Sequence, residues 1–177
     1  MLEDRRRIVT GHDEKGRSIV VIDGPPGNFF GSDTRGLAEI WNTDGGAVDS
    51  RDPADRATIP VVLSPEANGT KFRYFAIPPQ DPSIPPEELE RRTAERFAAM
   101  GAAQERPDTT RHPGMHRTPT IDYIILLSGE VTLLLDEDER ELKPFDVVVQ
   151  RGTNHAWINK GTEPALLIAV LMDAEVK

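Results

Sequence analysis

The second half of the chain is a series of short apolar segments separated by turn residues, and this pattern restricts the fold more than any other feature. The segments are rich in β-branched residues and leucine, and they are interrupted at Gly129 and at an acidic stretch, 136–139. They span residues 120–127, 131–135, 147–150, 156–158 and 165–172. Short strands at regular spacing predict an all-β sandwich or a closed barrel. Because the runs are apolar on both faces, we expect a second sheet or a partner subunit to cover them.

The first half of the chain holds most of the glycine and proline, and its apolar segments are shorter. A hairpin is predicted where two such segments flank a turn at 13–16, and Gly-Pro-Pro-Gly at 24–27 ends it because proline cannot donate to a sheet ladder. Two further strands are expected, followed by a stiff connector with five prolines at 78–86 and by a helix with acidic residues in its first turn. The two strands are placed at 37–43 and 71–77, and the helix at 87–100.

These elements form one structural domain with three parts. We assign residues 1–86 to an N-terminal β-rich extension that packs on the barrel, 87–101 to the helix and 112–177 to the barrel core. The strands of the extension carry few apolar residues, so we expect them to add to a barrel edge, their own or a partner's. Since isologous pairs are the commonest oligomers, the expected assembly is a homodimer.

Composition excludes several classes of partner. The chain has 21 basic and 30 acidic residues, which gives a net charge of −9 and argues against binding to nucleic acids or anionic membranes. The longest apolar run, 165–172, is far shorter than the ~20 residues that span a bilayer. The chain has no cysteine, which excludes disulfides and thiolate metal sites. With no signal peptide visible, we expect a cytoplasmic protein whose partner is a small molecule.

Three of the four histidines fall late in the chain, close to an acid within an apolar segment. Asp122 is costly in such a segment unless it is paired or coordinated. In an extended chain His116 and Asp122 share one face, and His155 shares a face with Trp157 on a later strand. Two histidines and a carboxylate would then converge inside a barrel and could bind a metal. The alternative is that the histidines lie on the surface and that Asp122 is salt-bridged.

Two segments resemble the sequence motifs of the cupin superfamily. His116, Asp122 and Gly129 match the histidine, acid and glycine of the first motif, and residues 151–159 resemble the second, which contains His155. The resemblance covers about residues 112–173. It implies a cupin-type antiparallel jelly-roll β-barrel with the N-terminal extension and one helix added.

This chain departs from the cupin pattern at several positions. Thr118 stands where the second histidine of the first motif is usual, and Asp122 replaces a glutamate. Phe145 replaces a glycine, and Gln150 replaces a proline. The four-ligand set of the family is therefore reduced, and an open coordination position would remain.

The resemblance implies a divalent metal ion (Fe, Mn, Ni or Zn) held by His116, Asp122 and His155, with His112 as a candidate fourth ligand. Thr118, Trp157 and Gln150 are expected to line the pocket. The function implied is a metal-dependent enzyme that acts on a small organic or aromatic acid by oxygenative cleavage, decarboxylation or isomerisation. The alternative is a non-catalytic small-molecule-binding cupin with a vestigial metal site.

Two arginines beside the motifs are weaker candidates for binding a substrate carboxylate. Arg117 and Arg151 each offer a guanidinium that can bind a carboxylate through two hydrogen bonds. Strand alternation places Arg117 on the side opposite the expected ligands, which favours a role on the surface or in a subunit contact.

Overall fold

The computed structural model describes residues 1–175 as eleven β-strands, one α-helix and two short 3₁₀ helices. The first strands are β1 (Arg7–His12), β2 (Ser18–Gly24), β3 (Asn28–Ser32), β4 (Arg35–Thr43) and β5 (Thr70–Ile77), followed by helix α1 (Pro86–Ala99). The remaining strands are β6 (Thr120–Ser128), β7 (Val131–Leu135), β8 (Glu139–Leu142), β9 (Val147–Arg151), β10 (His155–Ile158) and β11 (Ala165–Asp173). The 3₁₀ helices are η1 (Arg56–Thr58) and η2 (Ala103–Glu105).

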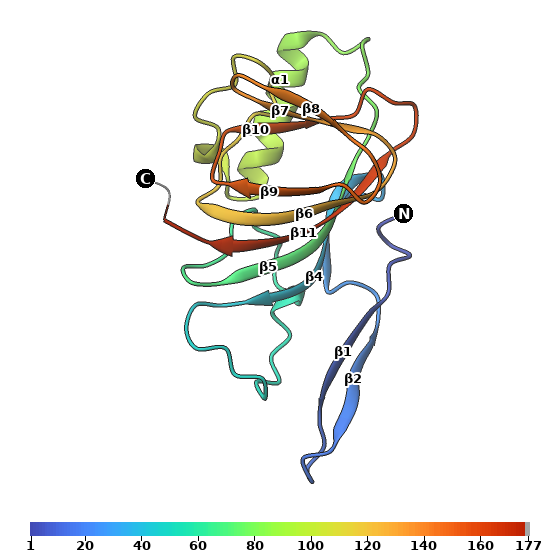
Figure 1. The fold of residues 1–177 in the computed structure, drawn as a ribbon, viewed down its shortest axis with the longest axis vertical. Helices are drawn as coiled ribbons and strands as arrows, with labels where there is room; N and C mark the ends of the chain where they lie inside the picture. Colours follow the sequence, from blue (N-terminus) through green and yellow to red (C-terminus); the bar gives the residue numbers. More distant parts are fainter. Residues whose placement is uncertain (176–177) are drawn as a thin grey trace.

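Two antiparallel sheets form the body of the molecule. The larger has the strand order β3-β4-β5-β11-β6-β9, and the smaller has the order β10-β7-β8 (Figure 1). This arrangement confirms the predicted all-β jelly-roll barrel of the cupin type.

Strand β11 explains why the apolar segments need cover on both sides. It lies between β5 and β6, and it contributes residues to two separate apolar clusters. Leu167 and Ala169 face the main core inside the barrel, whereas Leu166 packs on the outer side in the cluster that contains Leu2. The N-terminus of the chain therefore covers part of the outer face of the sheet.

Strands β4 and β5 belong to the same sheet as β6 and β11, with β5 paired to β11 along its full length. Much of the segment assigned to the N-terminal extension thus contributes to the wall of the barrel. The boundary of the barrel core at residue 112 stays a prediction about domain organisation.

Helix α1 lies against the barrel and begins where the proline-rich connector ends. Pro86 occupies its first turn together with Glu87 and Glu88, whose charges the helix dipole favours at this end. Phe97 is buried against the barrel core, next to Met100 just beyond the helix. No helix among residues 1–175 has the length and apolar content that crossing a membrane requires.

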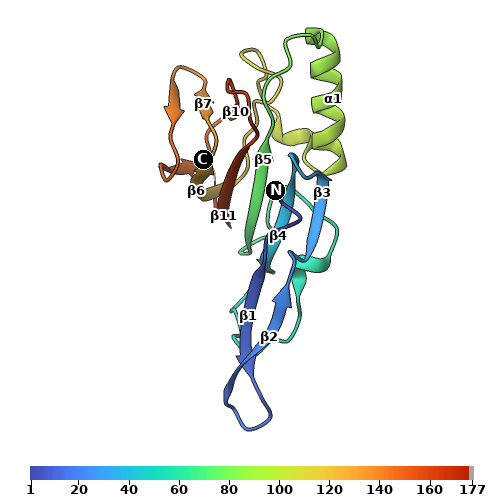
Figure 2. The same cartoon turned by 90° about the vertical axis from the view of Figure 1, so that its right-hand side faces the viewer.

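The β1–β2 hairpin extends away from the barrel, as Figures 1 and 2 both show. It forms a separate two-stranded sheet and exposes about half of the surface of Ile8, Val20 and Val21. A homodimer could bury the apolar surface of this hairpin. The homodimer itself stays a prediction.

Candidate functional site

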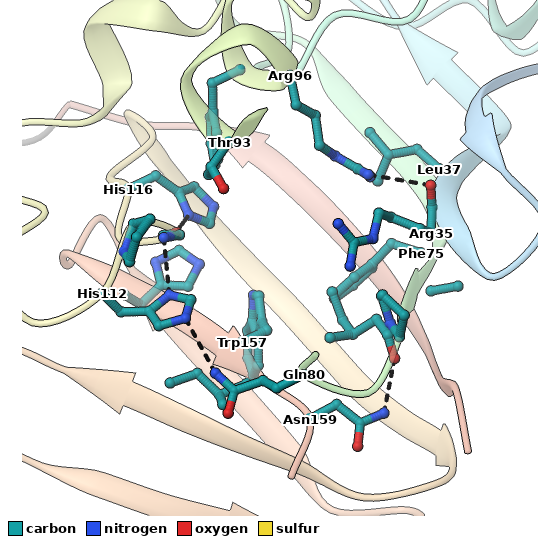
Figure 3. Close-up of a pocket in the computed structure, with 18 of the residues that line it drawn as sticks. Arg35, Leu37, Phe75, Gln80, Thr93, Arg96, His112, His116, Trp157 and Asn159 are labelled. Carbon is teal, nitrogen blue, oxygen red and sulfur yellow. Dashed lines mark hydrogen bonds between the residues drawn. The ribbon is translucent and has the colours of Figure 1, made fainter. Parts of the chain in front are cut away.

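A cavity of about 480 Å³ lies between the two sheets and under helix α1 (Figure 3). Its wall is mainly apolar and includes Leu37 and Phe75 from the larger sheet, Leu89 and Phe97 from the helix, and Trp157 from β10. The polar residues on its wall include five that the sequence singled out, namely His112, His116, Thr118, Asp122 and His155. The cavity is large enough for a drug-sized ligand, since such pockets measure about 300–1,000 Å³.

His116 and His155 lie opposite each other and are held by their own backbones. The His116 N–H donates to the His155 carbonyl at 2.9 Å, and the His155 N–H donates to the His116 carbonyl at the same distance. This bridge brings the two imidazole rings together, with their centroids 4.2 Å apart. The convergence of these two histidines, expected from the motifs, is therefore present.

Each imidazole ring is oriented by a hydrogen bond to the backbone carbonyl two residues earlier in the chain. The Nδ1 atom of His116 lies 2.9 Å from the Gly114 carbonyl, and that of His155 lies 2.9 Å from the Thr153 carbonyl. A carbonyl oxygen can only accept, so Nδ1 carries the proton and Nε2 keeps a free lone pair. Carbonyl acceptors of this kind commonly orient metal-binding histidines.

Burial keeps both histidines neutral. It lowers the pKa of His116 to about 4, with a smaller contribution from the charge of Arg106. Burial, and next the unfavourable electrostatic interaction that two protonated rings would have with each other, lower the pKa of His155 well below its usual value. At neutral pH each imidazole is therefore in the form that can bind a metal ion.

Asp122 points into the barrel from β6, as strand alternation predicts. It is 4% exposed, and its Oδ1 atom has no hydrogen-bond partner. Burial raises its pKa to about 6, whereas the Thr120 side chain and the charge of Arg73 act in the opposite direction. A buried carboxylate oxygen without a partner is costly, and a cation would relieve that cost.

The donor chemistry of these three side chains fits a divalent metal ion, because it offers two imidazole nitrogens and a carboxylate. The side chains are not gathered around one point, however. Among residues 1–175 no group of three His, Asp or Glu side chains has the spacing of a metal site. Metal binding would thus require Asp122 to turn toward the histidine pair, or a water molecule to bridge the gap.

His112 lies on the cavity wall beside Gln80, as Figure 3 shows. Its Nδ1 accepts a hydrogen bond from the Gly114 N–H at 2.9 Å, so in the neutral ring Nε2 carries the proton. That Nε2 lies 3.3 Å from Nε2 of Gln80, and it can donate to this side chain once the Gln80 amide is turned so that its oxygen faces the ring. Neither ring nitrogen is free in this arrangement, and the role of His112 as a fourth ligand stays a prediction.

The three residues expected to line the pocket differ in their positions. Thr118 lines the cavity, and its hydroxyl lies 2.6 Å from that of Thr120. Trp157 also lines the cavity, with its ring edge-on to His155 and the centroids 5.5 Å apart. Gln150 is not among the residues that line the cavity, and its expected role in the pocket stays a prediction. It is buried beside Asp122 in the β6–β9 pairing, and its amide donates to the Thr153 carbonyl at 3.2 Å.

Sequence reasoning missed residues of the wall that come from other parts of the chain. Arg35 at the start of β4 and Arg96 on α1 both line the cavity, whereas Arg117 and Arg151 are exposed outside it. Arg35 and Arg96 are 61 positions apart, and no motif connects them. Only the fold brings them together.

Asn159 fixes the edge of the cavity through its buried amide. Its Nδ2 donates to the carbonyls of Ile77 and Glu163 at 2.9 and 2.8 Å, and its Oδ1 accepts from the Gly161 N–H at 2.8 Å. Its backbone carbonyl accepts from the N–H of Gln80 at 2.9 Å. The side chain thereby joins β5 to the turn after β10.

The Asn159→Ala variant should therefore lower the free energy of unfolding by about 2–4 kcal/mol, because buried carbonyls and an N–H lose their partners. Urea denaturation followed by circular dichroism measures the change. Asn159→Asp keeps the acceptor but loses both donors, and we expect an intermediate loss. A change below about 0.5 kcal/mol in Asn159→Ala, the range of neutral surface substitutions, would contradict this assignment.

Comparisons with known proteins connect this chain to one family. A family model described as "Cupin domain" matches residues 106–171. Phomopsin biosynthesis cluster protein C' from Diaporthe leptostromiformis is 30% identical over 182 residues, which cover 98% of this chain and 81% of the relative. The cupin-domain-containing oxidoreductase fogC from Aspergillus ruber is 40% identical over 63 residues, which cover 33% of this chain and 31% of the relative. A solved Cupin 2 conserved barrel domain protein from Salinispora arenicola CNS-205 superimposes with a TM-score of 0.45 and 16% identity, covering 83% of this chain and 82% of the other.

Proposed function

This chain belongs to the cupin family, and we propose that it is a metal-dependent enzyme acting on a small organic or aromatic acid. The observation that carries the proposal is the pair of neutral histidines on the wall of a largely apolar cavity, with the unpartnered carboxylate oxygen of Asp122 on the same wall. Buried polar groups of this kind are functional candidates when they face a pocket. The relative from Aspergillus ruber that is named a cupin-domain-containing oxidoreductase supports an enzymatic role.

Different residues of the cavity would bind the metal ion and the substrate. His116, Asp122 and His155 would hold the metal ion, which supplies a Lewis acid or an oxygen-binding centre when bound. Trp157 and Phe75, whose ring centroids lie 6.1 Å apart, would hold the apolar body of the substrate and exclude water. Oxygenative cleavage, decarboxylation and isomerisation are the reaction types proposed for this site.

A panel assay tests the enzymatic role. Protein loaded separately with Fe(II), Mn(II), Ni(II) or Zn(II) is incubated with small aliphatic and aromatic acids, and oxygen uptake and products are followed. We expect turnover of at least one acid, and we expect Asp122→Asn to abolish it. Binding of acids without turnover by any metal-loaded form would instead support the alternative function, a non-catalytic small-molecule-binding cupin.

Thr118→His should tighten metal binding. Thr118 lines the same cavity as His116 and stands where the family places a further histidine, so an added imidazole would supply another nitrogen ligand. Titration with Fe(II) and Zn(II), together with melting curves, measures the effect. Unchanged affinity with lower stability would contradict the prediction, because it would mean that the imidazole overpacks the wall, at a cost of about 1–3 kcal/mol.

A further inference from the structure

Two arginines lie together on one side of the cavity, across from the histidines (Figure 3). Arg35 comes from the start of β4 and Arg96 from the last turn of α1. The Nη1 atom of Arg96 donates to the backbone carbonyl of Arg35 at 3.2 Å, which fixes one guanidinium beside the other residue. Arg96 also lies over the ring of Phe30, with its guanidinium carbon 5.6 Å from the ring centre.

Neither arginine has an anionic partner within the part of the chain that the structure describes. Other arginines on α1 do have one, since Arg91 pairs with Glu88 and Glu95 and Arg92 pairs with Glu88. Arg96 is half-buried and still unpaired. Burial, and then the like charge of Arg35, lower the pKa of Arg96 to about 10, so the site is short of negative charge.

Asp81, in the proline-rich connector, is a carboxylate on the cavity wall whose charge interacts with that of Arg35. Its Oδ1 atom accepts hydrogen bonds from the N–H and the hydroxyl of Ser83 at 2.9 and 2.6 Å. The charges of Arg92 and Arg35 act on it, yet it forms no ion pair with either. The two cavity arginines therefore keep their hydrogen-bond donors for another anion.

We infer that Arg35 and Arg96 form the carboxylate-binding subsite of this cavity. The ligand would be an acid with an elongated apolar body, whose carboxylate binds the two guanidinium groups. Its body would lie along Phe75 and Trp157, and its far end would reach the histidine pair. Guanidinium groups suit this task because their planar forks bind carboxylates through two parallel hydrogen bonds. The inference names the substrate class for the proposed function, but the binding step itself requires no metal.

Binding of matched acid and amide pairs to metal-free protein tests this subsite. The probes are cinnamate, 4-phenylbutyrate and octanoate with their primary amides, and isothermal titration calorimetry of the full chain measures each affinity. At least one acid should bind about tenfold more tightly than its amide, since charge-assisted hydrogen bonds are about twice as strong as neutral ones. Arg96→Gln and Arg35→Gln should each remove most of this preference, because acid binding weakens much more than amide binding when a charged donor is lost.

Two further variants serve as controls for position and for charge. Arg92→Gln, on the same helix but outside the cavity, should leave the preference intact, and Arg96→Lys should retain part of it because the positive charge remains. The subsite would be disproved if no acid binds more tightly than its amide, or if the preference survives in both glutamine variants. Because the protein is metal-free, this result is independent of whether the enzyme proposal holds.

Discussion

Replacing Glu39 by glutamine should lower the free energy of unfolding by about 3–5 kcal/mol, the usual cost of leaving a buried charge without its partner. Glu39 is fully buried on β4, and its Oε1 lies 2.7 Å from Nη2 of Arg73, which is 2% exposed. The contact is mainly electrostatic, because the two groups are not aligned as a hydrogen bond. Arg73 also donates to the carbonyls of Leu63 and Val62 at 3.0 and 2.9 Å, so its charge stays in place when Glu39 is neutralised.

Denaturant unfolding of Glu39→Gln measures this loss, with Glu95→Gln as the matched control. Glu95 pairs with Arg91 on the exposed face of α1, where an ion pair contributes about 1 kcal/mol or less. The double variant Glu39→Leu with Arg73→Met should recover much of the stability, because both buried charges are removed together. Equal effects of Glu39→Gln and Glu95→Gln would show that the buried pair is not a main source of stability.

The second large effect is expected from His155→Ala, which should weaken metal binding by at least about 100-fold. Changing a residue that only supports a ligand costs about 10–100-fold, so loss of a ligand should exceed that range. The backbone bridge between residues 116 and 155 does not depend on the side chain, and we expect the fold to persist. Equilibrium dialysis against a buffered metal, followed by elemental analysis, measures the affinity.

His12→Ala is the matched control for this experiment. His12 is exposed at the end of β1 and does not line the cavity, so its loss should leave the metal affinity unchanged. A metal content in His155→Ala equal to that in His12→Ala would remove His155 from the ligand set.

The sequence predicted the part of the site that local pattern determines. Alternation along β6 placed Asp122 inside the barrel, because every second residue from Thr120 to Leu126 is buried. The motifs also predicted that His116 and His155 converge, and they lie across one antiparallel bridge. These features depend on strand period and short-range spacing, which a single sequence records.

Other features could not be predicted because they depend on contacts between distant segments. Arg35 and Arg96 meet only because the last turn of α1 lies beside the start of β4, and neither residue belongs to a motif. Strand β8 lies partly in a stretch interpreted as an acidic turn, since its residues are largely exposed and carry no apolar alternation. The hydrogen bond of Gln150 to Thr153, in the turn after β9, is likewise a contact that the motifs do not predict.

The metal content of the wild-type protein tests the central claim most directly. The full chain is produced in medium supplied with iron, manganese, nickel and zinc, purified without a histidine tag, and analysed by mass spectrometry of the elements. We predict about one equivalent of a divalent metal per chain, because a competent site retains its metal through purification. Less than about a tenth of an equivalent would contradict the assignment of His116, Asp122 and His155 as a metal site.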